Sequence, residues 1–310
     1  MGAPITTSNF SKALWPGINA WYGKSYDEFP VEFKGLFDSY NTSRAYEEDV
    51  GVSSFGLAQV KSEGQSISYD EEAQAYITRY TPVVYALGFM ITREIYEDDQ
   101  YDIVGQRRAQ GLAFSMRQTK EIVAANVYNR AFNSSYTGGD GVELCSNAHP
   151  NWAGGTQSNY AAVDLSEGAL EQACINISKW TNDRGLRINV MPRSLIIPVD
   201  LQFEAERILM SSLRPGISPG ATTGGGLHDV NAIARMGKFP GGVVINHYLT
   251  DTNAWFIRTN VTNGMKHFQR REMQFADDSD FETENAKYKA TERYAFGWTD
   301  WRGMYGSTGA

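Results

Sequence analysis

Residues 288–305 read YKATERYAFGWTDWRGMY and hold the densest run of aromatic side chains, close to the end of the chain. Chain ends fray unless they are tied down, and each Trp or Tyr left in water forgoes a large gain from burial. In an extended strand Tyr294 and Trp298 fall on one face. Lys289 and Arg293 fall on the other face. We therefore expect a half-buried strand that closes a sheet.

The composition is that of a folded protein. The 310 residues suffice for one large domain or two modest ones, with enough apolar residues for a core. The net charge is −8, and no run of Lys or Arg is long enough to follow a phosphate backbone. The first residues do not resemble a secretory signal, and no apolar run is long enough to cross a membrane. We expect a soluble protein without direct nucleic-acid binding.

The first half of the chain changes character twice. Residues 1–50 are rich in aromatic side chains without clear periodicity, so they either lie along another surface or include a short helix near 31–40 packed on the main body. Residues 56–95 show strand alternation, with Ile67 and Tyr69 on one strand, a polar turn at 70–74, and a return strand. Two strands alone are marginal in water, so this long hairpin implies a partner surface.

A long helix is predicted over residues 97–132. Acidic residues at 97–99 suit its positive end, and Leu112, Met116, Val123 and Val127 form a stripe at helical spacing. Such a helix would be a rod of roughly 50 Å, far longer than an average helix in a globular protein. Its length indicates a mechanical strut.

The second half alternates between helices and strands. A helix capped by Ser166 and another capped by Asp200 are predicted, with short apolar strands at 195–197, 243–245 and 254–257. Residues 211–228 form a Gly/Pro/Ser/Thr loop that we expect to be mobile. The order of the elements indicates an α+β fold rather than regular βαβ units.

Motifs for catalysis or metal binding lack their required context. Residues 216–220 match the G-x-S-x-G pattern around Ser218, but they follow a helix and contain a proline, whereas a hydrolase nucleophile needs a strand-to-helix turn. Residues 277–280 lack the glycine and distal glutamate of a calcium loop, and the glycines of 220–226 are not followed by Lys-Ser or Lys-Thr.

The cysteines and histidines give no stronger signal. Cys145 and His149 are four residues apart, but no other ligand pair lies near them in the sequence. The four histidines are scattered, without a neighbouring carboxylate at a productive spacing. We therefore predict a structural protein rather than an enzyme, without a cofactor or metal.

Three segments carry a resemblance to a known family. Residues 293–307, RYAFGWTDWRGMYGS, resemble the closing segment of Mu-like major head subunits of tailed bacteriophages. The HPNW motif at 149–152 with Gly154 and Gly155, and MPRSLIIP at 191–198, are similar to the same group. The chain thus resembles a tailed-phage major capsid protein with the Hong Kong 97-type fold.

The resemblance implies a division of the chain into functional parts. These are an N-terminal arm over 1–50, an extended loop hairpin over 51–95, a peripheral domain with the spine helix over 96–139, an axial domain over 140–265, and return strands of the peripheral domain over 266–310. Because this chain lacks a long charged helical prefix, scaffolding is expected from a separate protein, or the sequence is the processed form.

The same resemblance implies the function. A phage or prophage protein of this kind self-assembles through hexamers and pentamers into an icosahedral shell that encloses double-stranded DNA without binding it specifically. Its expected partners are portal and scaffolding proteins and a decorating protein, with assembly in the host bacterial cytoplasm and a final place in the virion capsid. An encapsulin-type compartment shell and, with weaker support, a serine hydrolase using Ser218 are the alternatives. The residues predicted at subunit contacts are Trp15, Trp21, Tyr22, Tyr69, Tyr76, Tyr80, Trp298 and Trp301.

Overall fold

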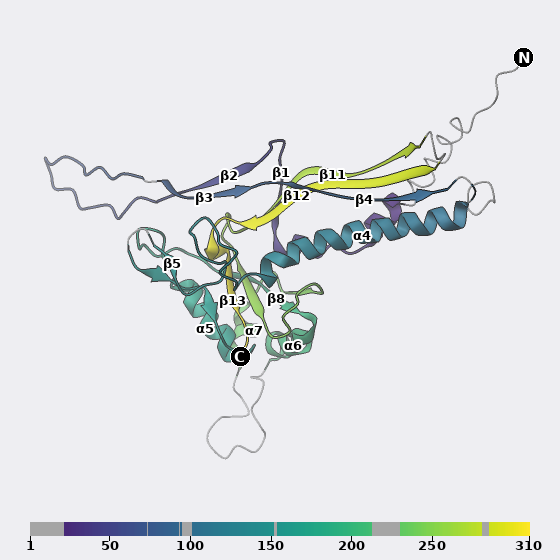
Figure 1. Ribbon diagram of the computed structural model, residues 1–310. Helices are drawn as coiled ribbons and strands as arrows, with labels where there is room; N and C mark the ends of the chain where they lie inside the picture. The colour runs from purple at the N-terminus through teal and green to yellow at the C-terminus, as the bar shows by residue number, and fades with distance from the viewer. Residues whose placement is uncertain are drawn as a thin grey trace, which may run out of the picture.

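The computed structural model describes residues 22–72, 74–92, 94, 101–151, 154–212, 230–280 and 285–310; the side chains of 101–104 and 279 lie outside this description. Two sheets organise these residues (Figure 1). An elongated unit combines a four-stranded sheet with a long helix, and a second unit below it combines a five-stranded sheet with three shorter helices.

The long sheet has the strand order β1-β11-β12-β4. The strands are β1 (Asp38–Asn41), β4 (Val83–Ile91), β11 (Met265–Ser279) and β12 (Ala286–Trp298). β11 and β12 are antiparallel, β4 runs antiparallel along the other side of β12, and β1 pairs in parallel with the start of β11. The predicted terminal strand is confirmed as β12, but it lies inside the sheet rather than at its margin.

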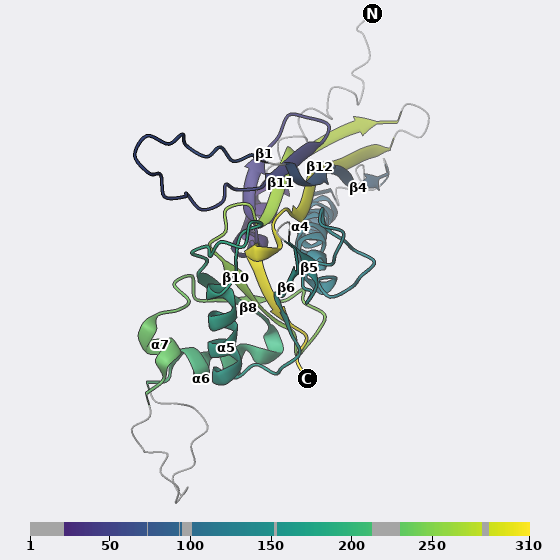
Figure 2. The ribbon, with the colours of Figure 1, turned by 90° about the vertical axis from the view of Figure 1, so that its left-hand side faces the viewer.

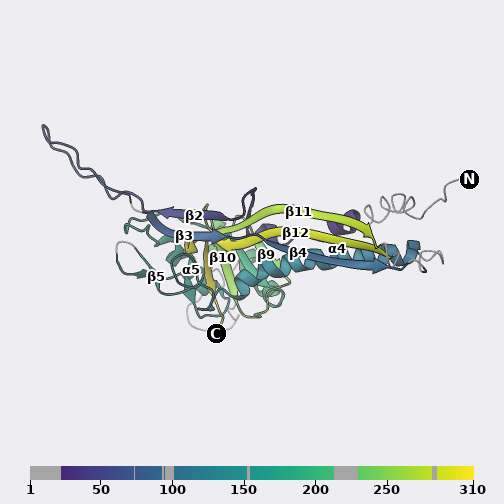
Figure 3. The same ribbon diagram turned by 45° about the horizontal axis from the view of Figure 1, so that its top comes forward.

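Helix α4 (Tyr101–Asn129) lies along one face of this sheet (Figures 1 and 3). At 1.5 Å per residue its 29 residues span about 44 Å. Leu112 and Met116 are buried against Tyr288 and Ala290 of β12, which anchors the helix to the sheet. The prediction of an exceptionally long helix is confirmed for residues 101–129.

The segment before β1 also packs on α4. Residues 22–28 are helical, and α2 (Phe33–Leu36) buries Phe33 and Leu36 beside Ala124 and Tyr128 of α4. The alternative prediction of a short helix near 31–40, packed on the main body, is confirmed for residues 33–36.

The second sheet has the order β7-β13-β10-β8-β9. Its strands are β7 (Tyr160–Ala161), β8 (Pro192–Pro198), β9 (Val243–Asn246), β10 (Trp255–Thr259) and β13 (Met304–Ser307). Helices α5 (Glu167–Ser178), α6 (Gln202–Met210) and α7 (Ala232–Met236) share a core with Trp255 and Ile257 on one face. Phe256, on the opposite face of β10, packs with α2 and the end of α4.

Helix caps show where local prediction succeeds and fails. Ser166 caps α5, because its side chain accepts a hydrogen bond from the backbone N–H of Ala169 at 3.2 Å. The predicted capping role of Asp200 is wrong. A 3₁₀ turn, η2 (Val199–Leu201), precedes α6, so Asp200 lies inside a turn and Leu201 holds the cap position without a side-chain hydrogen bond.

The end of the chain crosses from one sheet to the other through a close backbone contact. A 3₁₀ turn, η3 (Trp301–Gly303), leads from β12 into β13. A Cβ atom on Gly264 would lie 2.7 Å from the Cα atom of Gly303, so only glycine fits at this crossing. β13 pairs with β10 and β7 in the second sheet, whereas the family resemblance implied that 266–310 belong to the peripheral domain.

The predicted hairpin exists with different strands. β2 (Glu47–Val52) pairs antiparallel with β3 (Gln74–Tyr80), and the tight turn of the connecting segment is at 62–65, around Gly64 with φ +79°. The strand expected around Ile67 and Tyr69 is absent from the described residues, because an alternating segment needs a neighbouring strand and none lies beside it within the chain. β4 follows β3 but pairs with β12. Two short strands, β5 (His149–Pro150) and β6 (Thr156–Gln157), complete the description.

Candidate assembly surfaces

The projecting ribbon consists of β2, β3 and the segment 53–72 that follows β2. It extends well beyond the body of the molecule (Figures 1 and 3). The turn at 62–65 joins the two legs of the ribbon. At this far end the ribbon has no other element beside it (Figure 2). A two-stranded ribbon is marginal by itself, so its stability depends on its anchors to the body.

Polar contacts hold the base of the ribbon. Asp49 of β2 accepts a hydrogen bond from Lys266 of β11 at 2.5 Å and another from the Thr299 hydroxyl at 2.6 Å. The Tyr80 hydroxyl, at the end of β3, lies 2.6 Å from the Thr299 hydroxyl. Burial raises the pKa of Tyr80, so this phenol stays neutral. These contacts tie both strands to the long sheet.

Arg184 holds the ribbon further out. Its guanidinium donates to the carbonyl of Ser54 at 3.1 Å, to Asp70 Oδ1 at 3.0 Å and to the carbonyl of Glu71 at 2.5 Å. The backbone N–H of Gly56 donates to Asp70 Oδ2 at 2.7 Å, which is the main reason that the pKa of Asp70 is lowered. One arginine of the second unit therefore contacts both legs of the ribbon.

Apart from these contacts with Arg184, the ribbon exposes many apolar side chains. Val60 is 99% exposed and Tyr69 is 88% exposed. The other exposed apolar side chains of the ribbon are Val50, Val52, Phe55, Leu57, Ile67, Tyr76 and Ile77. So many exposed apolar side chains on one projecting element favour a protein interaction site. Chemically, the ribbon can bury apolar area against another molecule, and it lacks the convergent polar groups of an active site.

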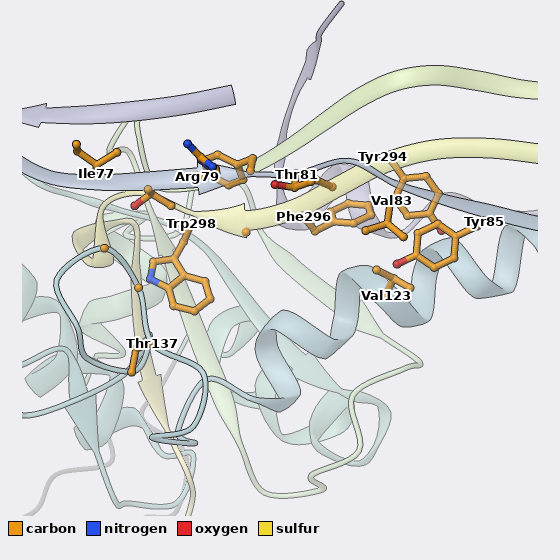
Figure 4. Close-up of a pocket in the computed structure, with 16 residues that line it drawn as sticks. Ile77, Arg79, Thr81, Val83, Tyr85, Val123, Thr137, Tyr294, Phe296 and Trp298 are labelled. Carbon is orange, nitrogen blue, oxygen red and sulfur yellow. The ribbon is translucent and has the colours of Figure 1, made fainter. Parts of the chain in front are cut away.

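A groove of about 400 Å³ opens at the root of the ribbon (Figure 4). Tyr85, Tyr294, Phe296 and Trp298 line it beside Val123 of α4, and the turn at 137–139 forms another wall. Arg79 is the one charged side chain in this lining, and it pairs with Glu48 at 2.6 Å. The groove therefore offers aromatic packing rather than acid–base chemistry.

Buried charges join the long helix to the long sheet. Lys120 of α4 donates to Glu292 of β12 at 2.5 Å, and the Tyr26 hydroxyl donates to the same carboxylate at 3.2 Å. Burial lowers the pKa of Lys120, while the neighbouring carboxylate opposes that shift. Because the pair is enclosed in the core, its role is to fix α4 on the sheet.

Two neighbouring groups have shifted pKa values. Glu121 accepts hydrogen bonds from the backbone N–H groups of Phe33 at 2.9 Å and Glu32 at 3.2 Å, and burial raises the pKa of its carboxyl to about 7. Burial, with a smaller contribution from Lys120, lowers the pKa of His267 to about 3. His267 is stacked on Phe296 with ring centroids 4.4 Å apart. Both groups are enclosed by packing rather than open to a substrate.

The predicted contact residues separate into three groups. Tyr22, Tyr80 and Trp301 are buried within the chain, and Trp298 is half-buried, so these side chains stabilise the single subunit. Tyr69 and Tyr76 stay exposed on the ribbon and remain predicted contacts. Trp15 and Trp21 lie outside the described residues.

The weak chemical motifs find structural explanations where they are described. His149 is buried, with Nδ1 2.6 Å from Asp140 and Nε2 3.1 Å from Asn159, and its ring is stacked on Trp301 at 4.5 Å. The thiol of Cys145 is buried in the core. Residues 277–279 belong to β11. Ser218 and most of the Gly-rich segment lie outside the described residues.

Neither metal binding nor membrane insertion gains support from the described part of the chain. Within it, no three His, Cys, Asp or Glu side chains gather as a metal site would require. Among the helices that the structure describes, none combines the length and apolar character needed to span a bilayer.

Sequence reasoning missed Asp49 and Arg184. The β2 strand carries three acids in its first three residues, a composition unusual for strands, and the Asp49–Lys266 pair joins residues far apart in the chain. Arg184 stands in a turn whose sequence gives no sign of the ribbon beside it.

Comparison with solved structures shows the same fold in a virus-like particle and in phage structures. The chain is similar to a virus-like particle from Pyrococcus furiosus, with 10% identity, a TM-score of 0.53, and coverage of 94% of this chain and 98% of the other. It is similar to the procapsid of bacteriophage JBD30, with 13% identity, a TM-score of 0.54, and coverage of 99% and 77%. Mycobacterium phage Adephagia gives 10% identity, a TM-score of 0.50, and coverage of 91% of each chain. No curated protein matches the sequence.

The comparison with protein families shows which family the chain belongs to. Residues 75–307 match a family described as phage capsid protein. Together with the structural likeness, this match confirms the α+β Hong Kong 97-type fold and the expectation of a structural capsid protein of a tailed phage rather than an enzyme. Proteins of this kind assemble into multimeric shells and end in the virion capsid. Because the match spans most of the chain, this protein belongs to the phage capsid protein family.

Proposed function

We propose that this chain, as the major capsid protein, assembles through hexamers and pentamers into an icosahedral shell around double-stranded DNA. The observation that carries the proposal is the projecting ribbon, whose apolar side chains are exposed in the single chain. Burying them requires another molecule, and a second copy of the chain is the partner always present during assembly.

We assign the two units to the two domains of a capsid subunit. The five-stranded sheet with α5, α6 and α7 is the axial domain, and it includes β13 from the end of the chain. The long sheet and α4 form the peripheral domain, whose length suits a strut between neighbouring capsomers. The ribbon is the extended loop, and the residues before α2 are the N-terminal arm.

The proposed capsid function also implies accessory proteins. A scaffolding protein, a portal protein and a decorating protein are the proposed accessory components, with assembly in the host bacterial cytoplasm. The net charge of −8 supports a container that encloses DNA without specific binding. An encapsulin-type shell would share the fold but enclose protein cargo, so the contents of purified particles separate the two functions.

Substitutions on the ribbon test the proposal. Leu57→Ser combined with Tyr69→Ser removes exposed apolar area without touching the core, so the subunit should fold normally but fail to form capsomers or shells. Val163→Ser, at an exposed position of the second unit, is the matched control and should assemble like the wild type. Normal assembly of the double variant, measured by sedimentation and electron microscopy, would contradict the proposed role of the ribbon.

A further inference from the structure

A second apolar surface, without ribbon residues in its lining, lies between α5 and α7. This groove, of about 430 Å³, is floored by Cys174 and Ile233 and bordered by the exposed side chains of Ile175 and Met236. Burial raises the pKa of the Cys174 thiol to about 11, so the thiol is neutral and behaves as an apolar group. The groove is suited to receive an apolar side chain rather than to perform chemistry.

The border of the groove carries mostly positive charge. Lys179, Arg187 and Lys238 line it together with one acid, Glu171. Lysine and arginine at a rim around an apolar floor favour an occupant that combines an apolar anchor with carboxylates.

Helix α6 presents such a combination. Phe203 and Met210 are seven residues apart, so they lie on the same face, and they are 67% and 70% exposed. The opposite face of α6 is held in the core by Ala205 and Ile208. A large aromatic side chain so exposed on a well-packed helix forgoes a burial gain that a partner surface would restore.

The surroundings of this ridge are mostly acidic. Asp200, Glu204 and Glu206 are exposed on or beside α6, against one exposed base, Arg207. The ridge and the groove therefore match in apolar character and are complementary in charge.

The groove is empty of the ridge within one subunit. None of its lining residues belongs to α6, and Phe203 and Met210 are exposed rather than buried in the groove of their own chain. Two complementary surfaces on different sides of one molecule generate a head-to-tail contact, and such contacts close into a ring when the rotation between copies is a whole fraction of a turn.

We propose that the α6 ridge of one subunit occupies the α5–α7 groove of the next, with Phe203 as the anchor. The proposal rests on the proposed function, because it names the surfaces through which capsid subunits meet around a capsomer. None of the residues that line this groove belongs to the ribbon, so the ribbon of the same chain leaves it free for α6.

Cross-linking between introduced cysteines tests the contact. In a Cys174→Ala background, Met210→Cys and Met236→Cys are made singly and together, so that the Phe203 anchor is kept, and assembled protein is oxidised and separated on a denaturing gel. The double variant should give a ladder of covalent oligomers that ends at the capsomer size, whereas each single variant should remain monomeric. Met210→Cys with Tyr136→Cys, an exposed position outside the groove, is the control pair and should give no ladder.

Charge reversal provides a second test. Glu204→Lys with Glu206→Lys should weaken capsomer association by roughly tenfold or more, because like charges then face one another. Adding Lys179→Glu and Lys238→Glu should restore association. Failure of this restoration while all variants stay folded would contradict the pairing.

The outcomes separate this contact from the proposed function. Shells or capsomers without a ladder would overturn the α6–groove contact and leave the capsid function standing. Equal cross-linking of a single variant would show a symmetric contact and would also overturn it. Monomers without a ladder would contradict both proposals.

Discussion

The ammonium group of Lys266 in β11 lies 2.5 Å from the carboxylate of Asp49 in β2, and this ion pair joins the projecting ribbon to the long sheet. Lys266 is almost fully buried, and the same carboxylate accepts a hydrogen bond from Thr299. Asp49 of β2 therefore joins the ribbon to the long sheet through two polar contacts.

Asp49→Asn should lower the free energy of unfolding by about 1–3 kcal/mol, because a buried ammonium group loses its counter-charge. Urea unfolding measures the change. Glu48→Gln, one residue away in an exposed pair with Arg79, is the matched control and should change stability by less than about 1 kcal/mol. Equal effects of the two substitutions would show that the Lys266 pair is not an anchor.

Lys120→Met should lower the free energy of unfolding by about 3–5 kcal/mol, because it leaves the Glu292 carboxylate buried without a cation. The double variant Lys120→Met, Glu292→Leu should be more stable than Lys120→Met alone, since neither charge then remains in the core. Chemical denaturation of the wild type and both variants gives the comparison. If the double variant is instead less stable than Lys120→Met, the two charges do not stabilise the packing of α4 by neutralising each other.

The Glu121 carboxyl should make stability depend on pH. Its pKa is raised from 4.5 to about 7, so the folded state holds the proton more tightly than the unfolded state. The resulting stabilisation is complete below about pH 4.5 and is lost as the pH rises through about 7. Glu121→Gln should therefore gain stability relative to the wild type as the pH rises across this window, as measured by urea unfolding at pH 5 and pH 8. A pH-independent difference would contradict the assignment.

The His267 imidazole should make stability fall as the pH decreases, opposite to the effect of Glu121. Its pKa is lowered from 6.5 to about 3, so the unfolded state takes up the proton first as the pH falls. The wild type should lose stability as the pH falls from about 6.5 toward about 3, and His267→Gln should lose less over the same range. Thermal unfolding at pH 4 and pH 7 checks this, and parallel losses in both proteins would assign the acid sensitivity to other groups.

Arg184→Ala should loosen the ribbon without unfolding the protein. Removing the hydrogen bonds to Ser54, Asp70 and Glu71 should change the free energy of unfolding little, since the site is exposed to solvent. Cleavage by trypsin after Lys61 should become several-fold faster, because the two legs separate more often. Arg187→Ala, which stands three residues later, is the control. Unchanged cleavage would show that Arg184 does not hold the ribbon.

Local sequence patterns predicted the elements whose cause is local. The α4 stripe at helical spacing and the cap at Ser166 depend on neighbours within a few residues, and both are found in the structure. The aromatic end of the chain was expected to be buried because its exposure would be unfavourable, and Tyr294 and Trp301 are buried.

The parts that sequence did not predict depend on distant partners. β2 is acidic and resembles a loop, yet it pairs with β3, and Asp49 reaches Lys266 across the fold. Ile67 and Tyr69 alternate like a strand but have no strand beside them in one chain. The α5–α7 groove and the α6 ridge appear only when helices far apart in sequence pack on one sheet, so no linear motif marks them.

Sedimentation of the purified chain at high concentration, combined with negative-stain electron microscopy, tests the central claim most directly. A capsid subunit should form hexamers, pentamers or closed shells, either alone or with a co-expressed scaffolding protein. A compact monomer that persists under both conditions would contradict the claim that this chain builds a shell.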